Sequence, residues 1–258
     1  MELRILEKDY RVHVYETGPD GKLNLHTLFD YLQDAASEHA IMLGYGRDAL
    51  MEKNHNWVLS RMYAEIHDWP SWGDTVTVRT WPKGTESVFA LRDFEASFAD
   101  GRPVASATSS WLIIDSTTKR IQRPDAKLSQ YNTETPHRDA LQRNAARLEP
   151  AHEDGNISPE FSVRISDLDV NYHTNNVKYI KWVTDSCDPG FVMKNVPYSA
   201  EINYLAESRY GQRILVRLSG DKDNSTLFNY SVLRTPDNVE LCRVRIGWKN
   251  NLQEKKIV

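Results

Sequence analysis

The first half of the chain reads Ala64-Glu65-Ile66 and then Gly73-Asp74-Thr75-Val76-Thr77-Val78-Arg79. The second half reads Ala200-Glu201-Ile202 and then Gly211-Gln212-Arg213-Ile214-Leu215-Val216-Arg217, with two more residues between its parts. Self-similarity of this kind indicates that one structural unit occurs twice in the chain. Chance can produce one such match, so the flanking segments decide whether the repeat is structural.

A helix is expected before each copy of this pattern. In residues 25–43 apolar side chains recur at helical spacing, and Gly44 follows as a natural C-terminal stop. In residues 177–187 the same spacing recurs, and the helix is expected to end before Asp188-Pro189-Gly190.

Strands are expected around each helix. Each copy is followed by two strands joined by a turn: residues 88–98 and 104–114 across Asp100-Gly101, and residues 226–233 and 239–248 across Pro236-Asp237-Asn238. Residues 10–16 and 161–165 are the expected lead-in strands.

The order strand, helix and consecutive hairpin strands therefore occurs twice. This order predicts an α+β protein in which an antiparallel sheet curls around a long helix in each unit. The predicted units are residues 1–130 and 158–258. The polar stretch between them, residues 131–157, is interpreted as a linker that contains one helix at residues 139–147.

Composition excludes several classes of function. The chain has 258 residues and a formal net charge of −4, which argues against a nucleic-acid binder that works by bulk charge. Two cysteines, Cys187 and Cys242, give neither a disulfide framework nor a zinc-site spacing, so a reducing compartment is expected. The N-terminus has no apolar signal region and no run reaches membrane-spanning length. We therefore expect a cytoplasmic protein with neither a nucleic-acid nor a membrane partner.

The richest polar segment is Asp167-Leu168-Asp169-Val170-Asn171-Tyr172-His173-Thr174-Asn175-Asn176. It directly precedes the second predicted helix. The N-terminus of a helix favours negative charge, including the developing oxyanion of a reaction. This loop is therefore the candidate active site.

Three stretches of the chain carry a resemblance to a known family. They are residues 167–180, Tyr204-Leu205-Ala206-Glu207-Ser208, and Trp57-Val58-Leu59-Ser60-Arg61-Met62 with Pro70-Ser71-Trp72-Gly73-Asp74. They resemble the acyl-acyl carrier protein (acyl-ACP) thioesterase family of bacteria and plant plastids. The resemblance covers most of residues 5–125 and 158–248, and it implies the double hot-dog fold.

The resemblance also implies an activity, a partner and a set of site residues. The implied activity is hydrolysis of a fatty acyl-acyl carrier protein to free fatty acid, a reaction of fatty acid biosynthesis that needs no metal or other cofactor. Carried over by position, the catalytic residues are Asp169, Asn171, His173 and Glu207. The implied partner is acyl carrier protein, and a homodimer is left open.

Physical chemistry suggests a role for each catalytic residue. Glu207 suits a general base, which contributes roughly 10²–10⁴ in rate, and His173 would orient the water or the thioester. A backbone N–H at the start of the second helix, with Asn171 or His173, would stabilise the oxyanion. Asp169 would orient its neighbours. Asn175 and Asn176 at the same helix start are expected to bind substrate.

Ser208 stands where plant members of the family commonly have Cys. If Glu207 faces the site on a strand, alternation directs Ser208 to the opposite face. Water is therefore favoured over Ser208 as the nucleophile.

The first half of the chain provides an internal comparison. Asn24-Leu25-His26-Thr27 echoes Asn171-Tyr172-His173-Thr174, but Trp69 and Pro70 stand at the positions of Glu207 and Ser208. We therefore expect the second unit to do the chemistry and the first to hold the acyl chain. The residues expected to line the acyl-chain site are Leu28, Phe29, Leu32, Ala35 and Ala36.

Three alternative functions stay open. An acyl-CoA thioesterase would use the same chemistry with a different carrier, and a hot-dog hydroxyacyl-thioester dehydratase would pair a His with a carboxylate without using water. A non-catalytic acyl-thioester sensor would need no base. Lys178, Lys181, Arg209 and Arg213 would meet an acidic carrier protein or be solvated surface. The sequence predicts neither the preferred chain length nor its saturation.

Overall fold

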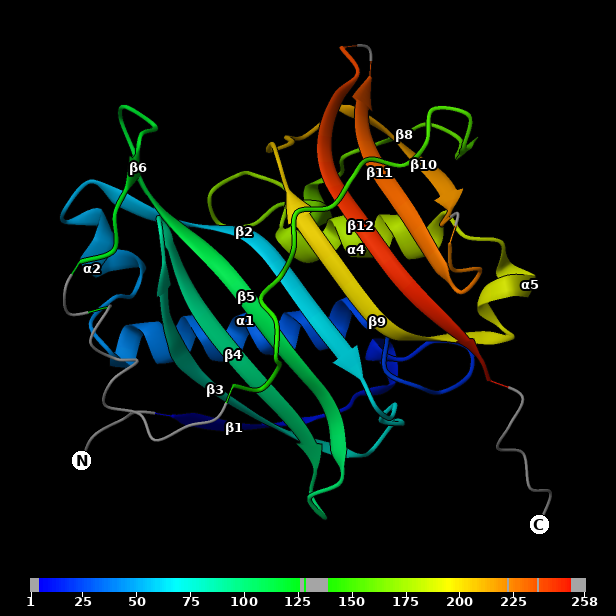
Figure 1. The fold of residues 1–258 in the computed structure, drawn as a ribbon, viewed down its shortest axis with the longest axis horizontal. Helices are drawn as coiled ribbons and strands as arrows, with labels where there is room; N and C mark the ends of the chain where they lie inside the picture. Colours follow the sequence, from blue (N-terminus) through cyan, green and yellow to red (C-terminus); the bar gives the residue numbers. More distant parts are fainter. Residues whose placement is uncertain (1–4, 126–127, 129–138, 222, 236, 252–258) are drawn as a thin grey trace. The chain divides into compact units, whose positions relative to one another are not determined.

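The computed structural model describes residues 5–125, 128, 139–221, 223–235 and 237–251 (Figure 1). The chain forms two compact units, Met1–Ala145 (unit 1) and Ala146–Val258 (unit 2). Their boundary lies inside the stretch interpreted as a linker, residues 131–157. Within the described residues, no helix is both long enough and apolar enough to cross a membrane.

Unit 1 is an antiparallel sheet with a long helix. The strand order is β1-β3-β4-β5-β2, and β6 pairs with β5. The strands are β1 (Leu6–Arg11), β2 (His55–Ile66), β3 (Thr75–Glu86), β4 (Phe89–Phe98), β5 (Pro103–Asp115) and β6 (Ile121–Gln122). The helices are α1 (Leu25–Met42), α2 (Arg47–Met51) and a single 3-10 turn, η1 (Val14–Glu16).

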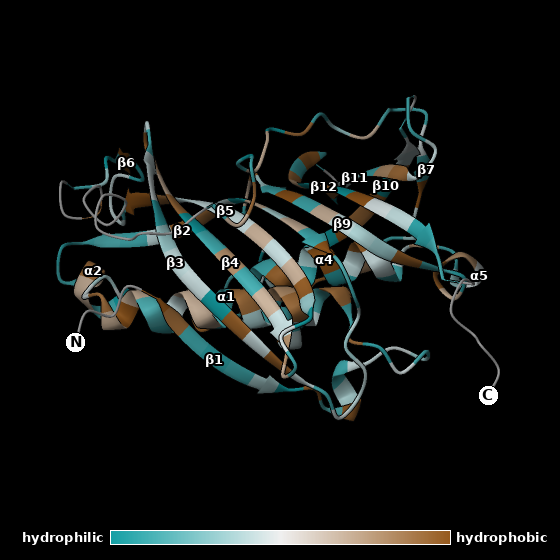
Figure 2. Ribbon diagram, turned by 60° about the horizontal axis from the view of Figure 1, so that its bottom comes forward, coloured by the Kyte–Doolittle hydropathy of each residue, from teal (hydrophilic) through white to brown (hydrophobic). Residues whose placement is uncertain are grey.

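Helix α1 is the centre of unit 1, and it confirms the helix predicted for residues 25–43. It starts after Asn24 and stops at Leu43 and Gly44, where Gly44 takes the left-handed conformation that glycine tolerates (φ 79°). Its apolar face packs on the sheet, with β3 among its contacts (Figure 2). Burial of this face removes apolar surface from water and holds the helix in place.

Unit 2 repeats the arrangement with a shorter helix. The strand order is β9-β12-β11-β10, and both β7 and β8 pair with β10. The strands are β7 (Asn156–Ile157), β8 (Phe161–Ser162), β9 (Asn195–Tyr204), β10 (Arg213–Gly220), β11 (Leu227–Thr235) and β12 (Val239–Asn250). The helices are α4 (Asn176–Asp185), α5 (Pro189–Val192) and the 3-10 turn η2 (Ile165–Asp167). The predicted helix at residues 177–187 is thus confirmed as α4.

The predicted duplication and the α+β class are confirmed. Ala64-Glu65-Ile66 ends β2 and Ala200-Glu201-Ile202 lies in β9, so both copies occupy the same strand of their units. The turn between β4 and β5 contains Gly101 at φ 85°, and that between β11 and β12 contains Asn238 at φ 54°. Pro236, part of the second predicted turn, lies outside the described residues.

The predicted lead-in strands are wrong in extent. The first ends at Arg11 and is followed by η1, and the second is shortened to Phe161–Ser162 and followed by η2. The Glu16 carboxylate accepts the N–H of His13 at 2.7 Å, and Asp167 accepts that of Arg164 at 2.8 Å. These side chains close a turn where the strand was expected, because local side-chain acceptors compete with sheet pairing.

The helix predicted at residues 139–147 does not form. Its segment is irregular, because side chains on the sheets take up its backbone donors. The Ala140 N–H donates to Asp93 Oδ2 at 2.8 Å within unit 1, and the Ala146 N–H donates to Glu201 Oε1 at 2.6 Å within unit 2. Just beyond this segment, the Leu148 N–H donates to Asn203 Oδ1 at 2.8 Å. Polar side chains on the strands thus anchor the connecting segment.

Candidate active site

The polar segment forms a tight loop between η2 and α4. Leu168 and Thr174 pair across it, and the Asp169 N–H donates to the His173 carbonyl at 2.8 Å. The Asp169 carboxylate accepts the N–H groups of Asn171 (2.8 Å) and His173 (3.3 Å). Tyr172 sits at φ 61° at the tip of the loop. Asp169 therefore holds the shape of the loop that carries Asn171 and His173.

The start of α4 is capped by the loop itself. The Asn175 side chain accepts the N–H of Val177 at 3.1 Å, as an N-cap residue does, and its own N–H donates to Asp167 O at 2.8 Å. The Asn176 carbonyl accepts the hydroxyl of Tyr204 at 3.2 Å. These bonds fix the helix start beside the loop. Substrate binding by Asn175 and Asn176 stays a prediction.

His173 and Glu207 come together although 33 residues separate them in the sequence. His173 Nε2 lies 3.4 Å from Glu207 Oε2, with the His side chain 27% exposed and the Glu side chain 59% exposed. Glu207 lies in the loop after β9, not in the strand that alternation assumed. The pair is accessible to solvent and to a substrate.

Arg209 lies beside this pair, whereas the sequence predicted it only as a contact of an acidic carrier protein or as solvated surface. One of its guanidinium nitrogens, Nη2, lies 3.3 Å from His173 Nε2. An unprotonated Nε2 accepts from Arg209, whereas a protonated Nε2 donates to Glu207. His173 Nε2 can therefore hydrogen-bond to Arg209 or to Glu207 according to the imidazole tautomer. The only feature of the sequence that points to Arg209 is its position two residues after Glu207.

Ser208 is buried beneath this pair. It is 0% exposed, and its Oγ lies 2.7 Å from Thr174 Oγ1 and 3.0 Å from the Tyr179 hydroxyl. Burial raises the pKa of Tyr179 to about 12, so its hydroxyl is neutral at ordinary pH. A fully buried hydroxyl held by two neighbours is poorly placed to attack a substrate. The geometry supports the preference for water as nucleophile.

The corresponding loop of unit 1 has the same backbone but different side chains. The Gly18 N–H donates to Lys22 O at 2.8 Å, as Asp169 does to His173, and Gly21 has φ 75° where Tyr172 has 61°. Lys22 therefore stands at the position of His173.

The same comparison corrects the sequence echo. Asn24 is the N-cap of α1, so it corresponds to Asn175 and not to Asn171. The Leu23 N–H donates to Pro70 O at 2.8 Å, and the Thr174 N–H donates to Ser208 O at 2.9 Å. Pro70 thus matches Ser208, and unit 1 has neither the imidazole nor the carboxylate at these positions.

The residues expected to line an acyl-chain site lie on the buried face of α1. Leu28, Phe29, Leu32 and Ala35 are 0% exposed and Ala36 is 4% exposed. They form part of the apolar interior of unit 1, and their contact with an acyl chain stays a prediction.

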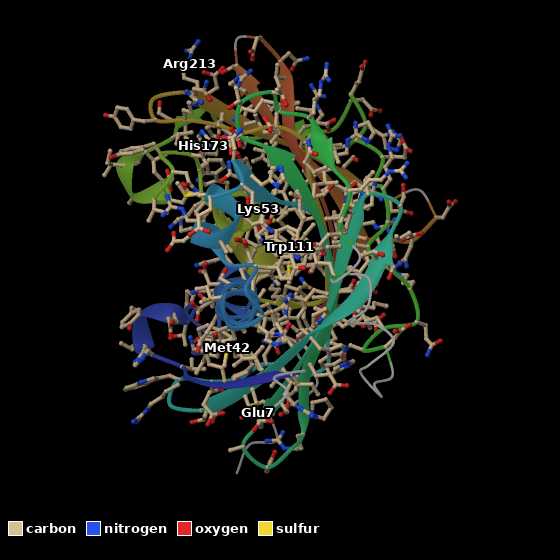
Figure 3. The ribbon with its side chains drawn as sticks, turned by 90° about the vertical axis from the view of Figure 1, so that its left-hand side faces the viewer. Glu7, Met42, Lys53, Trp111, His173 and Arg213 are labelled. Carbon is tan, nitrogen blue, oxygen red and sulfur yellow. The ribbon has the colours of Figure 1, made fainter. Side chains whose placement is uncertain are left out.

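The cations near the site are partly engaged. Lys181 pairs with Asp185 at 2.6 Å, and Arg213, labelled with His173 in Figure 3, pairs with Glu160 at 3.2 Å. Among the described residues, no group of three or more His, Cys, Asp and Glu side chains is placed to hold a metal ion.

Two family profiles match the chain. The acyl-ACP thioesterase N-terminal domain matches residues 4–129 and the C-terminal domain matches residues 151–250. Palmitoyl-acyl carrier protein thioesterase of Gossypium hirsutum is 28% identical over 95% of this chain and 64% of its own length. Oleoyl-acyl carrier protein thioesterase 1 of Arabidopsis thaliana is 32% identical over 70% of this chain and 54% of its own length. The chain spans less than two thirds of the length of these curated relatives.

Solved structures share the fold. An acyl-ACP thioesterase from Bacteroides thetaiotaomicron superposes with a TM-score of 0.86 at 22% identity, covering 95% of this chain and 98% of that one. A 12:0-ACP thioesterase from Umbellularia californica gives 0.85 at 21% identity, covering 97% and 99%. The two-unit hot-dog architecture expected from the sequence is therefore the observed one.

Proposed function

The chain belongs to the acyl-ACP thioesterase family, and from this membership we propose that it hydrolyses fatty acyl-acyl carrier protein to free fatty acid and acyl carrier protein. The observation that carries the proposal is the accessible pair of His173 and Glu207, with Nε2 and Oε2 3.4 Å apart. Thioester hydrolysis needs a base that takes a proton from water, and this pair supplies a carboxylate next to an imidazole.

In the proposed reaction, Glu207 takes a proton from a water molecule that His173 helps to orient. The water oxygen bonds to the thioester carbonyl carbon, and the carbonyl oxygen becomes an oxyanion. The C–S bond then breaks, and the departing pantetheine sulfur takes the proton from the His173–Glu207 pair. The products are the carboxylic acid and the free thiol, so no co-reactant besides water is required.

The oxyanion donor we propose is the side-chain amide of Asn171. Asn171 is an exposed residue of the same loop as His173, and the Asp169 carboxylate holds its backbone N–H at 2.8 Å. Loss of one oxyanion donor typically costs about 2.7–4 kcal/mol of transition-state stabilisation.

The proposal assigns chemistry to unit 2 and acyl-chain binding to unit 1. Support comes from the side chains at matching loop positions, where unit 1 has Lys22 and Trp69 in place of His173 and Glu207. The proposed partner is acyl carrier protein, and the proposed location is the cytoplasm.

A thiol-release assay tests the proposal. Acyl-ACP substrates from C8 to C18 are compared with the matching CoA thioesters, and fast release from the carrier substrates is expected. Comparable or faster thiol release from the CoA thioesters would indicate that the protein is an acyl-CoA thioesterase. An enoyl product without free thiol would indicate a dehydratase, and tight binding without turnover a sensor.

A further inference from the structure

The two catalytic side chains lie on separate loops, and the residues that follow them tie those loops together. Thr174 follows His173 and Ser208 follows Glu207; both are buried, at 5% and 0% exposure. The Thr174 N–H donates to Ser208 O at 2.9 Å, and their hydroxyl oxygens lie 2.7 Å apart. The exposed pair therefore rests on a buried polar link.

Tyr179 reaches this link from the first turns of α4. Its hydroxyl accepts the backbone N–H of Ser208 at 3.1 Å and lies 3.0 Å from Ser208 Oγ. Its ring, 2% exposed, packs edge-on against Trp182 at 5.1 Å and Tyr204 at 6.0 Å. A side chain held on its ring faces in this way has little freedom to move its hydroxyl.

We propose that Tyr179 is a positioning residue that sets the distance between Glu207 and His173 by anchoring the backbone of the Glu207 loop to helix α4. The same helix is joined to the His173 loop through Asn175 and Asn176. The loops of both catalytic side chains are thus attached to the same helix, α4. This inference rests on the proposed thioesterase function.

The anchor acts mainly through the main chain. The Ser208 N–H bond to Tyr179 and the Ser208 carbonyl bond to Thr174 both survive when the Ser208 hydroxyl is removed. Removal of the Tyr179 hydroxyl instead leaves the buried Ser208 N–H without its acceptor, and the loop relaxes. Displacement of a catalytic group by about 1 Å can cost on the order of 10²-fold in rate.

The test is Tyr179→Phe in the full chain, measured with acyl-ACP. We expect kcat to fall by about 10- to 100-fold with KM changed less than about threefold, because substrate contacts stay and alignment is lost. The loss should exceed that of Ser208→Ala. The matched control is Tyr230→Phe, which removes another buried hydroxyl of unit 2, one that accepts the Trp248 Nε1–H at 3.3 Å and lies 3.5 Å from Cys187 Sγ, beyond the far end of α4 from both loops.

A double-mutant cycle separates positioning from general destabilisation. If Tyr179 acts through Glu207, Tyr179→Phe should reduce kcat much less in a Glu207→Gln background than in the wild type. Equal losses in both backgrounds, or an equal loss in Tyr230→Phe, would overturn the inference, as would unchanged kcat in Tyr179→Phe. If the wild-type protein releases no thiol at all, the proposed function itself fails, which is a distinct result.

Discussion

Glu207 and His173 are accessible, whereas the residues that follow each of them are buried. Side-chain exposure falls from 59% at Glu207 to a fully buried Ser208. At the scale of single residues, the proposed reactive groups are therefore exposed, and the residues proposed to align them are buried.

Replacement of the base is the most direct test at this scale. Glu207→Gln keeps the size of the side chain and removes its ability to accept a proton from water. Turnover should fall by about 10² or more. Thermal unfolding should stay near that of the wild type, since Glu207 is exposed. Activity close to wild type would show that the role of Glu207 is assigned wrongly.

Ser208→Ala separates the two candidate nucleophiles. The backbone hydrogen bonds of Ser208 to Tyr179 and Thr174 do not need its hydroxyl, so the Glu207 loop should keep its position. We therefore expect a loss of turnover well under tenfold. Mass spectrometry after rapid quenching should find no acyl-enzyme. An acyl group trapped on Ser208 would replace the water mechanism with a covalent one.

At the scale of elements, the helices and hairpins were predictable because their signals are local. The period of apolar residues and the stop at Gly44 specify α1, and the same holds for α4. The path of the connecting segment was not predictable, because it depends on Asp93, Glu201 and Asn203, which are distant in sequence. Likewise the contact between Ser208 and Tyr179 forms only where the loop after β9 meets α4. The spacing of residues along the sequence does not predict this contact.

Asn203 provides a test of the anchored segment. Its side chain, 3% exposed, accepts the N–H of Leu148 and donates to the Ala146 carbonyl at 2.9 Å. Asn203→Ala leaves a buried N–H unpaired, so the free energy of unfolding should fall by about 1–3 kcal/mol. Chemical denaturation measures this loss. Lys249→Ala at an exposed strand position should change stability by less than about 0.5 kcal/mol, and equal effects would contradict the assigned role.

The hydrogen bond from the Ala140 N–H to the Asp93 carboxylate holds the connecting segment in unit 1, and its acceptor is titratable. Burial raises the pKa of Asp93, partly offset by Thr108, Lys83 and the Ala140 N–H. A carboxyl with a higher pKa in the folded chain stabilises the fold most below its unfolded pKa, and this contribution is lost as pH rises through the folded value. Asp93→Asn cannot ionise. The stability of this variant relative to wild type should therefore increase as pH rises above the unfolded carboxyl pKa of about 4, measured by denaturation; a constant difference would refute this.

At the scale of the whole molecule, the two units share a framework and differ in their side chains. Unit 2 has the proposed base, Glu207, and the imidazole of His173, and unit 1 has the longer buried helix, with 18 residues against 10. This asymmetry is the physical basis for assigning the acyl chain to unit 1.

Placing a larger side chain in the interior of unit 1 tests that assignment. Ala35→Leu adds bulk on the buried face of α1, so turnover of C16 and C18 substrates should fall relative to C8 and C10. Ser37→Leu on the exposed face is the control. The ratio of kcat/KM values between long and short chains is the readout, since overpacking alone costs about 1–3 kcal/mol of stability without favouring one substrate. An unchanged ratio would show that the acyl chain binds elsewhere in the protein.

The loop at the start of each long helix has a consequence for how the chain separates chemistry from folding. One main-chain bond closes the loop in both units, Gly18 to Lys22 in one and Asp169 to His173 in the other, and an aspartate carboxylate supports each loop, Asp20 in unit 1 and Asp169 in unit 2. Because the same backbone path carries Lys22 in one unit and His173 in the other, the exposed side chain at this position can change without a change of fold. The chemistry of a loop and its folding are therefore specified by different residues of the same short segment.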